Sequence, residues 1–453
     1  MNAIEIDIPL LIGGLLALIW IRFRKPVYFF QVACQFVGTL WGQYSLGISW
    51  SLAKLVPFLA ITTVDKIQIP NSRMFLPFMA YTIFCGLLFS MFWNIPDGVS
   101  FGYGYGRIWI QLATFIPLAF TARAFAGAMT QKKGVLLMWK ALMLLGIAHG
   151  IAFLYQYAAS SFGLPYIGIS RAHGLSMESG GDVAAFAIEG GQVILRPGGL
   201  AGEPKSVAVI FGIILLTGLI AGKPQNISKQ WLTIASISML LSLIGFVGAF
   251  STSCFIAFIS VYVALVSLRL VRFSSMILSI PLLAILIVGS NYILSILDLP
   301  TLIDLISIRT VERLGDDFAM DGPVEIAIQI MSQEPLVLFF GTGIGGGSFR
   351  IMEFMREVFK YAYSPNIGLI ALLFELGLVG TLLLLLPYSF LVILVARKIH
   401  SCNFSDDKWS LKFLLILSLS TMIFILSGTG IALGYSLAVG SILSASQFLS
   451  LKK

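Results

Sequence analysis

ILRPGGLAGEPKSVA, residues 194–208, places an arginine, paired glycines, an acid and a proline directly ahead of a long apolar run. Charged side chains beside hydrocarbon cost roughly 2.5–3.5 kcal/mol each on insertion scales, which makes Arg196, Glu203 and Lys205 candidates for function. Pro204 suits the first turn of a helix, where its missing N–H is not needed, and the glycines permit a sharp bend before it. The stretch therefore predicts a polar turn that enters a membrane protein from one side.

The chain as a whole is too apolar to fold in water. Of its 453 residues, 58% are hydrophobic and 11% are charged, and the mean hydropathy is +0.95. Soluble domains carry about 25% charged residues. The apolar runs are continuous over about 20 residues instead of alternating, which favours helices over a membrane β-barrel. We therefore expect an all-α polytopic membrane protein, in which the net charge of +8 does not indicate binding of nucleic acid.

The apolar runs predict about 13 transmembrane helices, within a range of about 12–14. Lys and Arg gather in alternate short loops, which the positive-inside rule assigns to the cytoplasm. Most acids lie in the opposite loops, two of which are long. The expected spans lie near residues 8–21, 26–44, 46–64, 74–93, 108–128, 134–157, 205–221, 231–250, 253–270, 273–297, 366–396, 412–427 and 430–449.

This topology gives the chain two long outer loops, and because most of the polar residues lie there we expect the chemistry on the outer side. In the first loop, residues 180–191 are typical of a loop or a short amphipathic helix. In the second, residues 323–332 predict a helix, and residues 341–347 a glycine turn. The expected parts are N-terminal helices 1–157, first outer loop 158–204, central helices 205–297, second outer loop 298–365 and C-terminal helices 366–453.

The cysteines and histidines do not indicate a metal site. The four cysteines form no CxxC pair, and we interpret them as small buried apolar residues. His149, His173 and His400 are widely separated in the sequence. We therefore expect no bound metal and no cofactor.

Three arginines on the outer side predict a phosphate site. A guanidinium group binds phosphate oxygens in a bidentate manner, and glycines let backbone N–H groups approach an anion closely. Arg196, Arg309 and Arg313, together with the turn at 341–347, would hold a lipid-linked phosphate or pyrophosphate at the outer membrane boundary. The alternative for Arg309 and Arg313 is pairing with nearby acids on a solvated helix.

Two acids have both a chemical and a structural interpretation. Glu203 is a candidate general base that removes a proton from a sugar hydroxyl. Its alternative is an acid at a helix N-terminus, where the macrodipole favours it by about 0.3–1 kcal/mol. Glu375 falls in the middle of an expected span, where its alternative is a neutral interhelical hydrogen bond.

Motifs in a fixed order resemble those of Wzy-type O-antigen polymerases. RPGGLAGEPKSVA (196–208) resembles their Arg…Gly-Glu-Pro signature, STSCFIAFI (251–259) the serine-started helix after it, and GTGIGGGSF (341–349) their glycine turn. SPNIGLIALLFELGLVG (364–380) resembles a segment shared with WaaL-type O-antigen ligases. Ligases place a histidine before the polar residue of this last motif, whereas Pro365 stands before Asn366 here, which favours the polymerase.

The resemblance implies a GT-C-type helical bundle with two large periplasmic loops in the bacterial inner membrane. The implied activity is metal-independent, inverting glycosyl transfer between undecaprenyl-pyrophosphate-linked repeat units, with the site facing the periplasm. Arg196, Arg309 and Arg313 would stabilise the leaving pyrophosphate, and Glu203 would be the base. Expected partners are the lipid-linked glycans, membrane lipid and a chain-length regulator. The residues expected to bind substrate are Arg171, Lys205, Gly343, Gly345, Tyr361, Tyr363 and Asn366.

Two other functions stay open at this point. An O-antigen ligase, which transfers polysaccharide to lipid A core, is suggested by the shared last motif. A transporter of a lipid-linked or anionic substrate is suggested by Lys54, Glu203 and Glu375, which are charged residues near or within expected spans.

Overall fold

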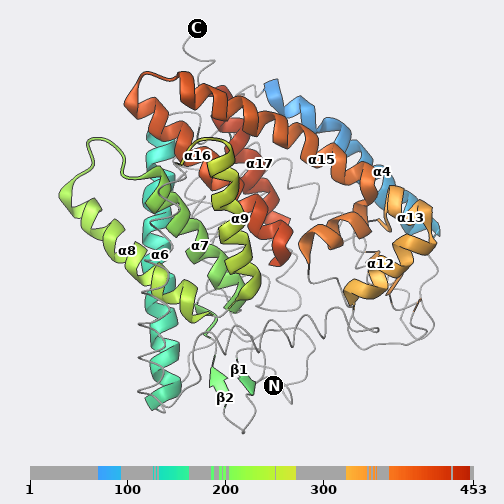
Figure 1. Ribbon diagram of the computed structural model, residues 1–453, viewed down its shortest axis with the longest axis horizontal. Coiled ribbons are helices and arrows are strands. Elements are labelled where there is room, and N and C mark those ends of the chain that lie inside the picture. Colours follow the sequence, from blue (N-terminus) through green and yellow to red (C-terminus); the bar gives the residue numbers. More distant parts are fainter. Residues whose placement is uncertain are drawn as a thin grey trace, which may run out of the picture.

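The protein is a helical, multi-pass membrane protein in the part of the chain that the computed structural model describes (Figure 1). Four helical segments are long and apolar enough to cross a membrane: Lys132–Ala159, Lys229–Gly248, Gly368–Ser401 and Ser405–Ser427. The described residues are 70–92, 126, 129, 132–162, 185–187, 193–195, 197–199, 204–249, 251–271, 323–343, 346–347, 350–351, 354, 367–429 and 432–448.

Helices make up nearly all of this structure. The N-terminal and central ones are η1 (Pro70–Phe75), α4 (Leu76–Phe92), α6 (Lys132–Phe162), α7 (Pro204–Ala221), α8 (Lys229–Gly248) and α9 (Thr252–Ser267). The C-terminal ones are α12 (Pro323–Gln333), α13 (Pro335–Phe340), α15 (Gly368–Ser401), α16 (Ser405–Phe424), the π-helical turn η3 (Ile425–Thr429) and α17 (Ala432–Gln447). Helices therefore occupy eight of the expected spans and the helix expected at 323–332.

The predicted ends agree with these helices to within five residues, with one clear exception. Residue 412 was the expected start of a span, whereas α16 begins at Ser405. The missing turn contains Asp406 and Asp407, which hydropathy excludes from a span but which are favoured in the first turn of a helix by its dipole. The expected spans 8–21, 26–44, 46–64, 108–128 and 273–297 lie outside the described residues, apart from Ala126.

A short antiparallel pair of strands corrects the prediction for residues 180–191. Strand β1 (Ala185–Ala187) pairs with β2 (Val193–Leu195), with Ala185 opposite Leu195. The loop or amphipathic helix expected there was therefore wrong for residues 185–187. Val193 and Ile194 are β-branched and favour a strand, and the pair ends directly before Arg196 in the sequence.

The core of the bundle forms around α7, in which residues 207–217 are all buried. Glycines on the neighbouring helices allow close packing. A Cβ at Gly245 of α8 would overlap the ring of Phe211, and a Cβ at Gly150 of α6 would lie 2.6 Å from Leu241. In a membrane, where lipid is as apolar as the helix surface, such small residues let the backbones approach and gain van der Waals contact.

The basic ends of the helices meet at one end of the bundle. Lys398 in the last turn of α15, Lys132 at the start of α6 and Lys229 at the start of α8 all belong to this end. Polar contacts tie it together: Trp409 Nε1 donates to Gly222 O at 3.1 Å, Lys398 Nζ donates to Ser446 O at 2.6 Å, and His400 Nε2 lies 3.0 Å from Leu268 O.

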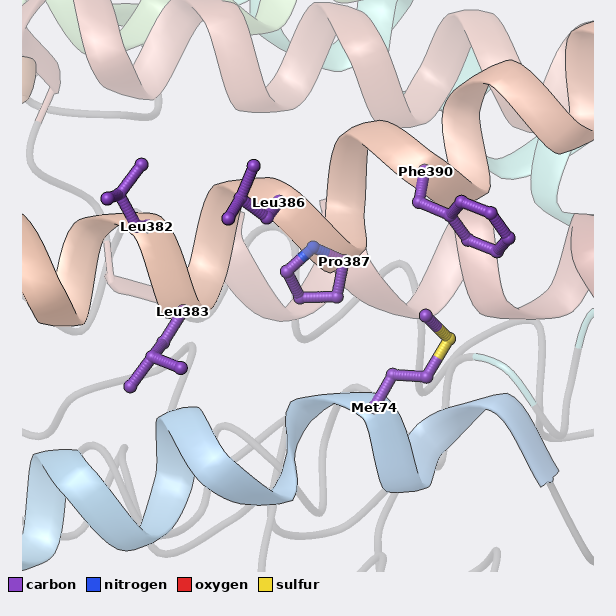
Figure 2. Close-up of a pocket in the computed structure, with 6 residues that line it drawn as sticks. All are labelled: Met74, Leu382, Leu383, Leu386, Pro387 and Phe390. Atoms are coloured by element: carbon purple, nitrogen blue, oxygen red, sulfur yellow. The ribbon is translucent and has the colours of Figure 1, made fainter.

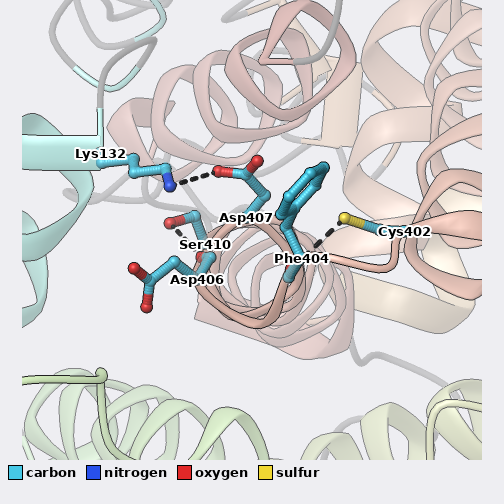
Figure 3. A network of polar contacts seen from close by, with 6 residues as sticks. All are labelled: Lys132, Cys402, Phe404, Asp406, Asp407 and Ser410. Carbon is cyan, nitrogen blue, oxygen red and sulfur yellow. Dashed lines mark hydrogen bonds and ion pairs between the residues drawn. The ribbon is translucent and has the colours of Figure 1, made fainter.

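An ion pair joins α6 to α16 at this basic end (Figure 3). Lys132 Nζ lies 2.8 Å from Asp407 Oδ1, and the Asp407 side chain is 1% exposed whereas that of Lys132 is 50% exposed. The neighbouring Asp406 points away, and its carbonyl accepts a hydrogen bond from Ser410 Oγ at 3.0 Å. A buried carboxylate therefore has its charge compensated by a lysine at the edge of the bundle.

Replacing Lys132 with methionine should destabilise the protein. Removing one partner of a fully buried ion pair costs about 3–5 kcal/mol, and because water screens the half-exposed Lys132 we expect a smaller loss, on the order of 1–2 kcal/mol. The measurement is the melting temperature of the detergent-solubilised protein. Lys133→Met is the matched control, because Lys133 is exposed. Equal melting temperatures for both variants would show that the pair contributes nothing.

Candidate functional site

The polar turn predicted ahead of residue 204 is present, and it lies against α6. Pro197, Gly198 and Gly199 are buried. Gly199 N–H donates to Gln156 Oε1 at 2.8 Å, and Gln156 Nε2 donates back to Gly199 O at 3.1 Å. Gly199 has a φ of 55°, which a glycine adopts without strain. A buried amide side chain therefore satisfies both backbone groups of Gly199 inside the bundle.

Two helices begin beside this turn. Helix α7 starts at Pro204, as predicted, and α9 follows Ser251 as its N-cap residue. Cys254 Sγ lies 3.6 Å from Lys205 O, and Ser251 Oγ lies 3.2 Å from Cys254 Sγ. The motif at 196–208 and the serine-started motif at 251–259 therefore lie side by side. Helix N-termini present free N–H groups and partial positive charge, so the starts of α7 and α9 favour an anion.

His149 is a buried residue of this region that the sequence did not single out. It is 1% exposed, and neither ring nitrogen has a hydrogen-bond partner among the described residues. Its ring packs edge-on against Phe211, and a Cβ at Gly199 would lie 3.7 Å from His149 Nδ1. An unpaired buried polar group costs about 1–3 kcal/mol. The sequence did contain a signal, which is a histidine within an apolar span. His149 was considered only as a metal ligand, so its place beside the turn was not predicted.

Helix α15 is interrupted at Gly377. This residue has φ 64° and ψ −178°, which is far from helical, and the helix changes direction there (Figure 1). Residues 368–376 thus form a short helical segment ahead of a longer one. The last carbonyl groups of the short segment have no donors within their own helix. In a membrane such groups must find other partners, because unsatisfied backbone is costly in hydrocarbon.

Donors from two distant parts of the chain bond these carbonyls. Thr342 N–H and Oγ1 donate to Phe374 O at 2.8 and 3.1 Å, Gly343 N–H donates to Glu375 O at 2.9 Å, and the Tyr81 hydroxyl lies 3.0 Å from Leu376 O. The Tyr81 hydroxyl also lies 2.9 Å from Phe340 O, which ties α4 to the end of α13. The glycine turn is therefore a cap for the interrupted helix.

This crossing requires a glycine in each of the two segments that meet there. A Cβ at Gly341 would lie 2.5 Å from Gly377 N, and a Cβ at Gly377 would lie 2.5 Å from Gly341 N. Both residues have positive φ, 77° for Gly341 and 64° for Gly377. The glycine turn of the motif at 341–349 and the Glu-x-Gly of the motif at 364–380 are thus packed against each other.

Glu375 lies at this crossing. The sequence placed it in the middle of a span, and the structure places it in the last turn of the short segment, two residues before the interruption. Its side chain is half-buried, and a Cβ at Gly347 would lie 3.4 Å from Glu375 Cγ. Tyr435 of α17, a helix that packs against α15, lies near Glu375. The glycine turn therefore faces the one acid of the described part of α15.

The π-helical turn η3 lies between the two motif pairs. It contacts α15, α9 and α7, and a Cβ at Gly368 would overlap the Ile425 carbonyl. Directly before η3, the ring of Phe424 fills the space beside Gly212 of α7. π-helical turns occur frequently at functional sites. The starts of α7, α9 and α15 and the end of α16 are therefore at the same end of the bundle, opposite its basic end.

Two of the predicted site residues are described, and both use backbone groups in packing. Lys205 is half-buried in the first turn of α7, and its carbonyl faces Cys254. The N–H of Gly343 donates to Glu375 O, so an anion at this turn must find other donors. The other predicted residues lie outside the described residues: Arg171, Arg196, Glu203, Arg309, Arg313, Gly345, Tyr361, Tyr363 and Asn366.

A shallow groove between η1 and α15 has no polar side chain in its lining that could take part in a reaction. Its volume is about 370 Å³. All of its lining residues are apolar, and Figure 2 shows them on facing surfaces: Met74, Leu382, Leu383, Leu386, Pro387 and Phe390. In the part of the chain that the structure describes, no three His, Cys, Asp or Glu side chains gather to hold a metal ion. The polar groups at the two motif pairs are therefore the candidate site.

Comparison with known proteins does not assign a family. No protein-family model matches the chain, and no curated protein matches it.

Proposed function

We propose that this protein is a glycosyltransferase of the O-antigen polymerase type. It joins undecaprenyl-pyrophosphate-linked oligosaccharide repeat units by inverting glycosyl transfer on the periplasmic side of the bacterial inner membrane. Its complete fold is then a GT-C-type bundle of about 12–14 transmembrane helices with two large periplasmic loops. It needs no metal, because arginines provide the positive charge.

The observation that supports this proposal best is the packing of the sequence motifs in pairs. Lys205 of the first motif contacts Cys254 of the second, and Gly341 of the third contacts Gly377 of the fourth. Both pairs lie at the end of the bundle opposite the basic helix ends, which the positive-inside rule assigns to the cytoplasm. Motifs far apart in sequence that meet on the outer side are expected of a periplasmic active site.

In the proposed reaction, a hydroxyl of the incoming repeat unit attacks the anomeric carbon of the growing glycan, and lipid pyrophosphate leaves. Arg196, with Arg309 and Arg313, would stabilise the charge on the leaving pyrophosphate. The N-termini of α7 and α9 add partial positive charge near the start of the first motif. Arg171, Lys205, Gly345, Tyr361, Tyr363 and Asn366 would contact the substrate.

The direct test is synthesis by the purified protein. Incubation with synthetic undecaprenyl-pyrophosphate-linked repeat units should give a ladder of products on a gel, spaced by one repeat unit. A product attached only to added lipid A core would support a ligase instead, which the last motif suggests. Recovery of unextended substrate by a well-folded protein, with several repeat-unit structures tried, would contradict the polymerase.

A transporter is the second candidate, and the interruption of α15 favours it. Discontinuous transmembrane helices with an acid beside the break form substrate and ion sites in many transporters. Uptake of lipid-linked or anionic substrate into proteoliposomes, with no glycan product, would support this function.

A further inference from the structure

The start of α16 lies where the protein has more positive charge than its acids balance. Three segments with six lysines and two aspartates meet there: residues 132–133, 222–229 and 405–412. The ion pair of Lys132 with Asp407 joins the first segment to the third, and the neighbouring Asp406 also lies near Lys132 (Figure 3). The other lysines of these segments have no acid partner among the described residues.

Lys408 and Lys412 differ from the other lysines because they form a pair on one helix. They are one turn apart on α16, so their side chains lie on the same face. Lys408 is exposed, whereas Lys412 is half-buried and lies between Leu411 and Phe413, which are both 0% exposed. Neither ammonium group has a carboxylate or carbonyl partner among the described residues. Like charges at this spacing repel each other, so the pair favours an anion beside it.

Aromatic side chains place this pair at the level of the lipid headgroups. Trp409 stacks on Phe413 with the ring centroids 5.5 Å apart, and its Nε1 donates to Gly222 O at 3.1 Å. A tryptophan with one apolar and one polar side is typical of the membrane–water interface. Phe404, which directly precedes α16, is 69% exposed, and an apolar ring is more stable against lipid than in water. The two lysines are therefore flanked by residues that favour contact with lipid.

The source of an anion at this depth is the membrane itself. The positive-inside rule assigns this end of the bundle to the cytoplasm. Anionic headgroups are fixed at the cytoplasmic surface of the membrane, and the negative potential of that surface attracts lysines and repels soluble anions. Basic side chains between transmembrane helices on this side are typical of binding sites for anionic lipids.

We propose that Lys408 and Lys412 bind the phosphate group of an anionic phospholipid on the cytoplasmic side of the membrane. Each ammonium group donates charge-assisted hydrogen bonds to phosphate oxygens. Lys408 lies between two contacts of α16, the ion pair of Asp407 with α6 and the hydrogen bond of Trp409 to the end of α7. The site lies at the opposite end of the bundle from the motif pairs, so it does not depend on the function proposed above.

The test is a titration of the purified full-length protein with phosphatidylglycerol in an uncharged detergent, followed by native mass spectrometry. We expect phosphatidylglycerol to bind at least about tenfold more tightly than phosphatidylcholine with the same acyl chains. A lysine beside an anionic headgroup contributes about fivefold in affinity. Lys408→Gln should therefore weaken binding of phosphatidylglycerol about fivefold, and Lys408→Gln combined with Lys412→Gln about 25-fold. A large excess of inorganic phosphate should not displace the lipid.

Arg269→Gln combined with Arg397→Gln is the matched control. It removes the same charge from exposed positions at the same end of the bundle, after α9 and near the end of α15, and should leave the affinity unchanged. Lys412→Arg keeps the charge at the half-buried position and should retain binding, which separates loss of the site from loss of the fold.

Three results would overturn the inference. Equal losses of affinity in the control and in the double lysine variant would show attraction to the whole basic end. A Lys408→Gln protein with wild-type affinity would exclude the exposed lysine, whose replacement leaves the core untouched. Displacement of phosphatidylglycerol by inorganic phosphate would show that the site takes a soluble anion.

Discussion

Alanine at position 377 should leave little folded protein. The new Cβ would lie 2.5 Å from the Gly341 nitrogen and closer still to the Phe339 carbonyl oxygen. Both are backbone atoms that cannot rotate away, so the segment at 339–341 and the segment at 377 would have to move apart. Separation would break the hydrogen bonds that Thr342 and Gly343 donate to α15. Adding the strain of a positive φ, on the order of 1–3 kcal/mol, we expect a loss above about 4 kcal/mol.

A second glycine separates the two causes of this effect. Gly222 has φ 73° and lies after α7 with no atom within 4 Å of an added Cβ, so Gly222→Ala introduces the strain without the clash. We expect it to cost only about 1–2 kcal/mol. Yield of monodisperse protein and melting temperature in detergent measure both variants. Similar losses in the two proteins would mean that the crossing of Gly341 and Gly377 does not stabilise the fold.

Local signals in the sequence were enough to locate the long helices that the structure describes, but not the short helix α13. Continuous apolar runs marked their lengths, and Pro204 marked the first residue of α7. Hydropathy failed where the signal was mixed, as at the charged start of α16, and where β-branched residues in a polar loop formed β2. The positions of the helices depend on the chemistry of residues that are neighbours in the sequence, which is why a sequence pattern detects most of them.

The interruption of α15 was not predictable in the same way. Residues 366–396 form one apolar run, and Gly377 by itself is tolerated within a helix. The break depends on donors from residues 342 and 343 and from Tyr81, which are distant in the sequence. The same is true of the hydrogen bonds between Gln156 and Gly199. Tertiary contacts decide both features, so no local pattern contains them.

The sequence predicted the candidate site from four motifs, and the assignment of its residues stays a prediction. The order of the motifs along the chain suggested one site, and the structure packs the first with the second and the third with the fourth. The sequence assigned the glycine turn to anion binding, but Gly343 donates its N–H to a helix carbonyl. His149 and Gln156 were not predicted, because a single polar residue within an apolar run shows no spacing that reveals its neighbours. The roles of Arg309 and Arg313 stay predictions.

Loss of the Arg196 side chain should abolish long glycan chains. Arg196 directly precedes Pro197, Gly198 and Gly199 in the sequence; these three are buried, and Gln156 near the C-terminal end of α6 bonds both backbone groups of Gly199. Helix α7 begins at Pro204, eight residues after Arg196 in the sequence, and its N-terminus favours an anion. A guanidinium at this position would stabilise the charge that develops on the pyrophosphate as it leaves. Removing one such group costs about 10²–10³-fold in rate.

Arg196→Ala is therefore expected to reduce polymerisation by at least about 100-fold without lowering the amount of protein in the membrane. Arg196→Lys should retain only part of the rate, because lysine keeps the charge and loses the bidentate geometry. Arg73→Ala is the control, since Arg73 is exposed in η1, which joins the basic end of the bundle through the 2.8 Å hydrogen bond of Asn71 to Ser446. A normal chain-length ladder from Arg196→Ala would exclude this arginine from the reaction. A ladder that is lost equally in the Arg73 variant would point to general damage, because that side chain belongs to neither motif pair.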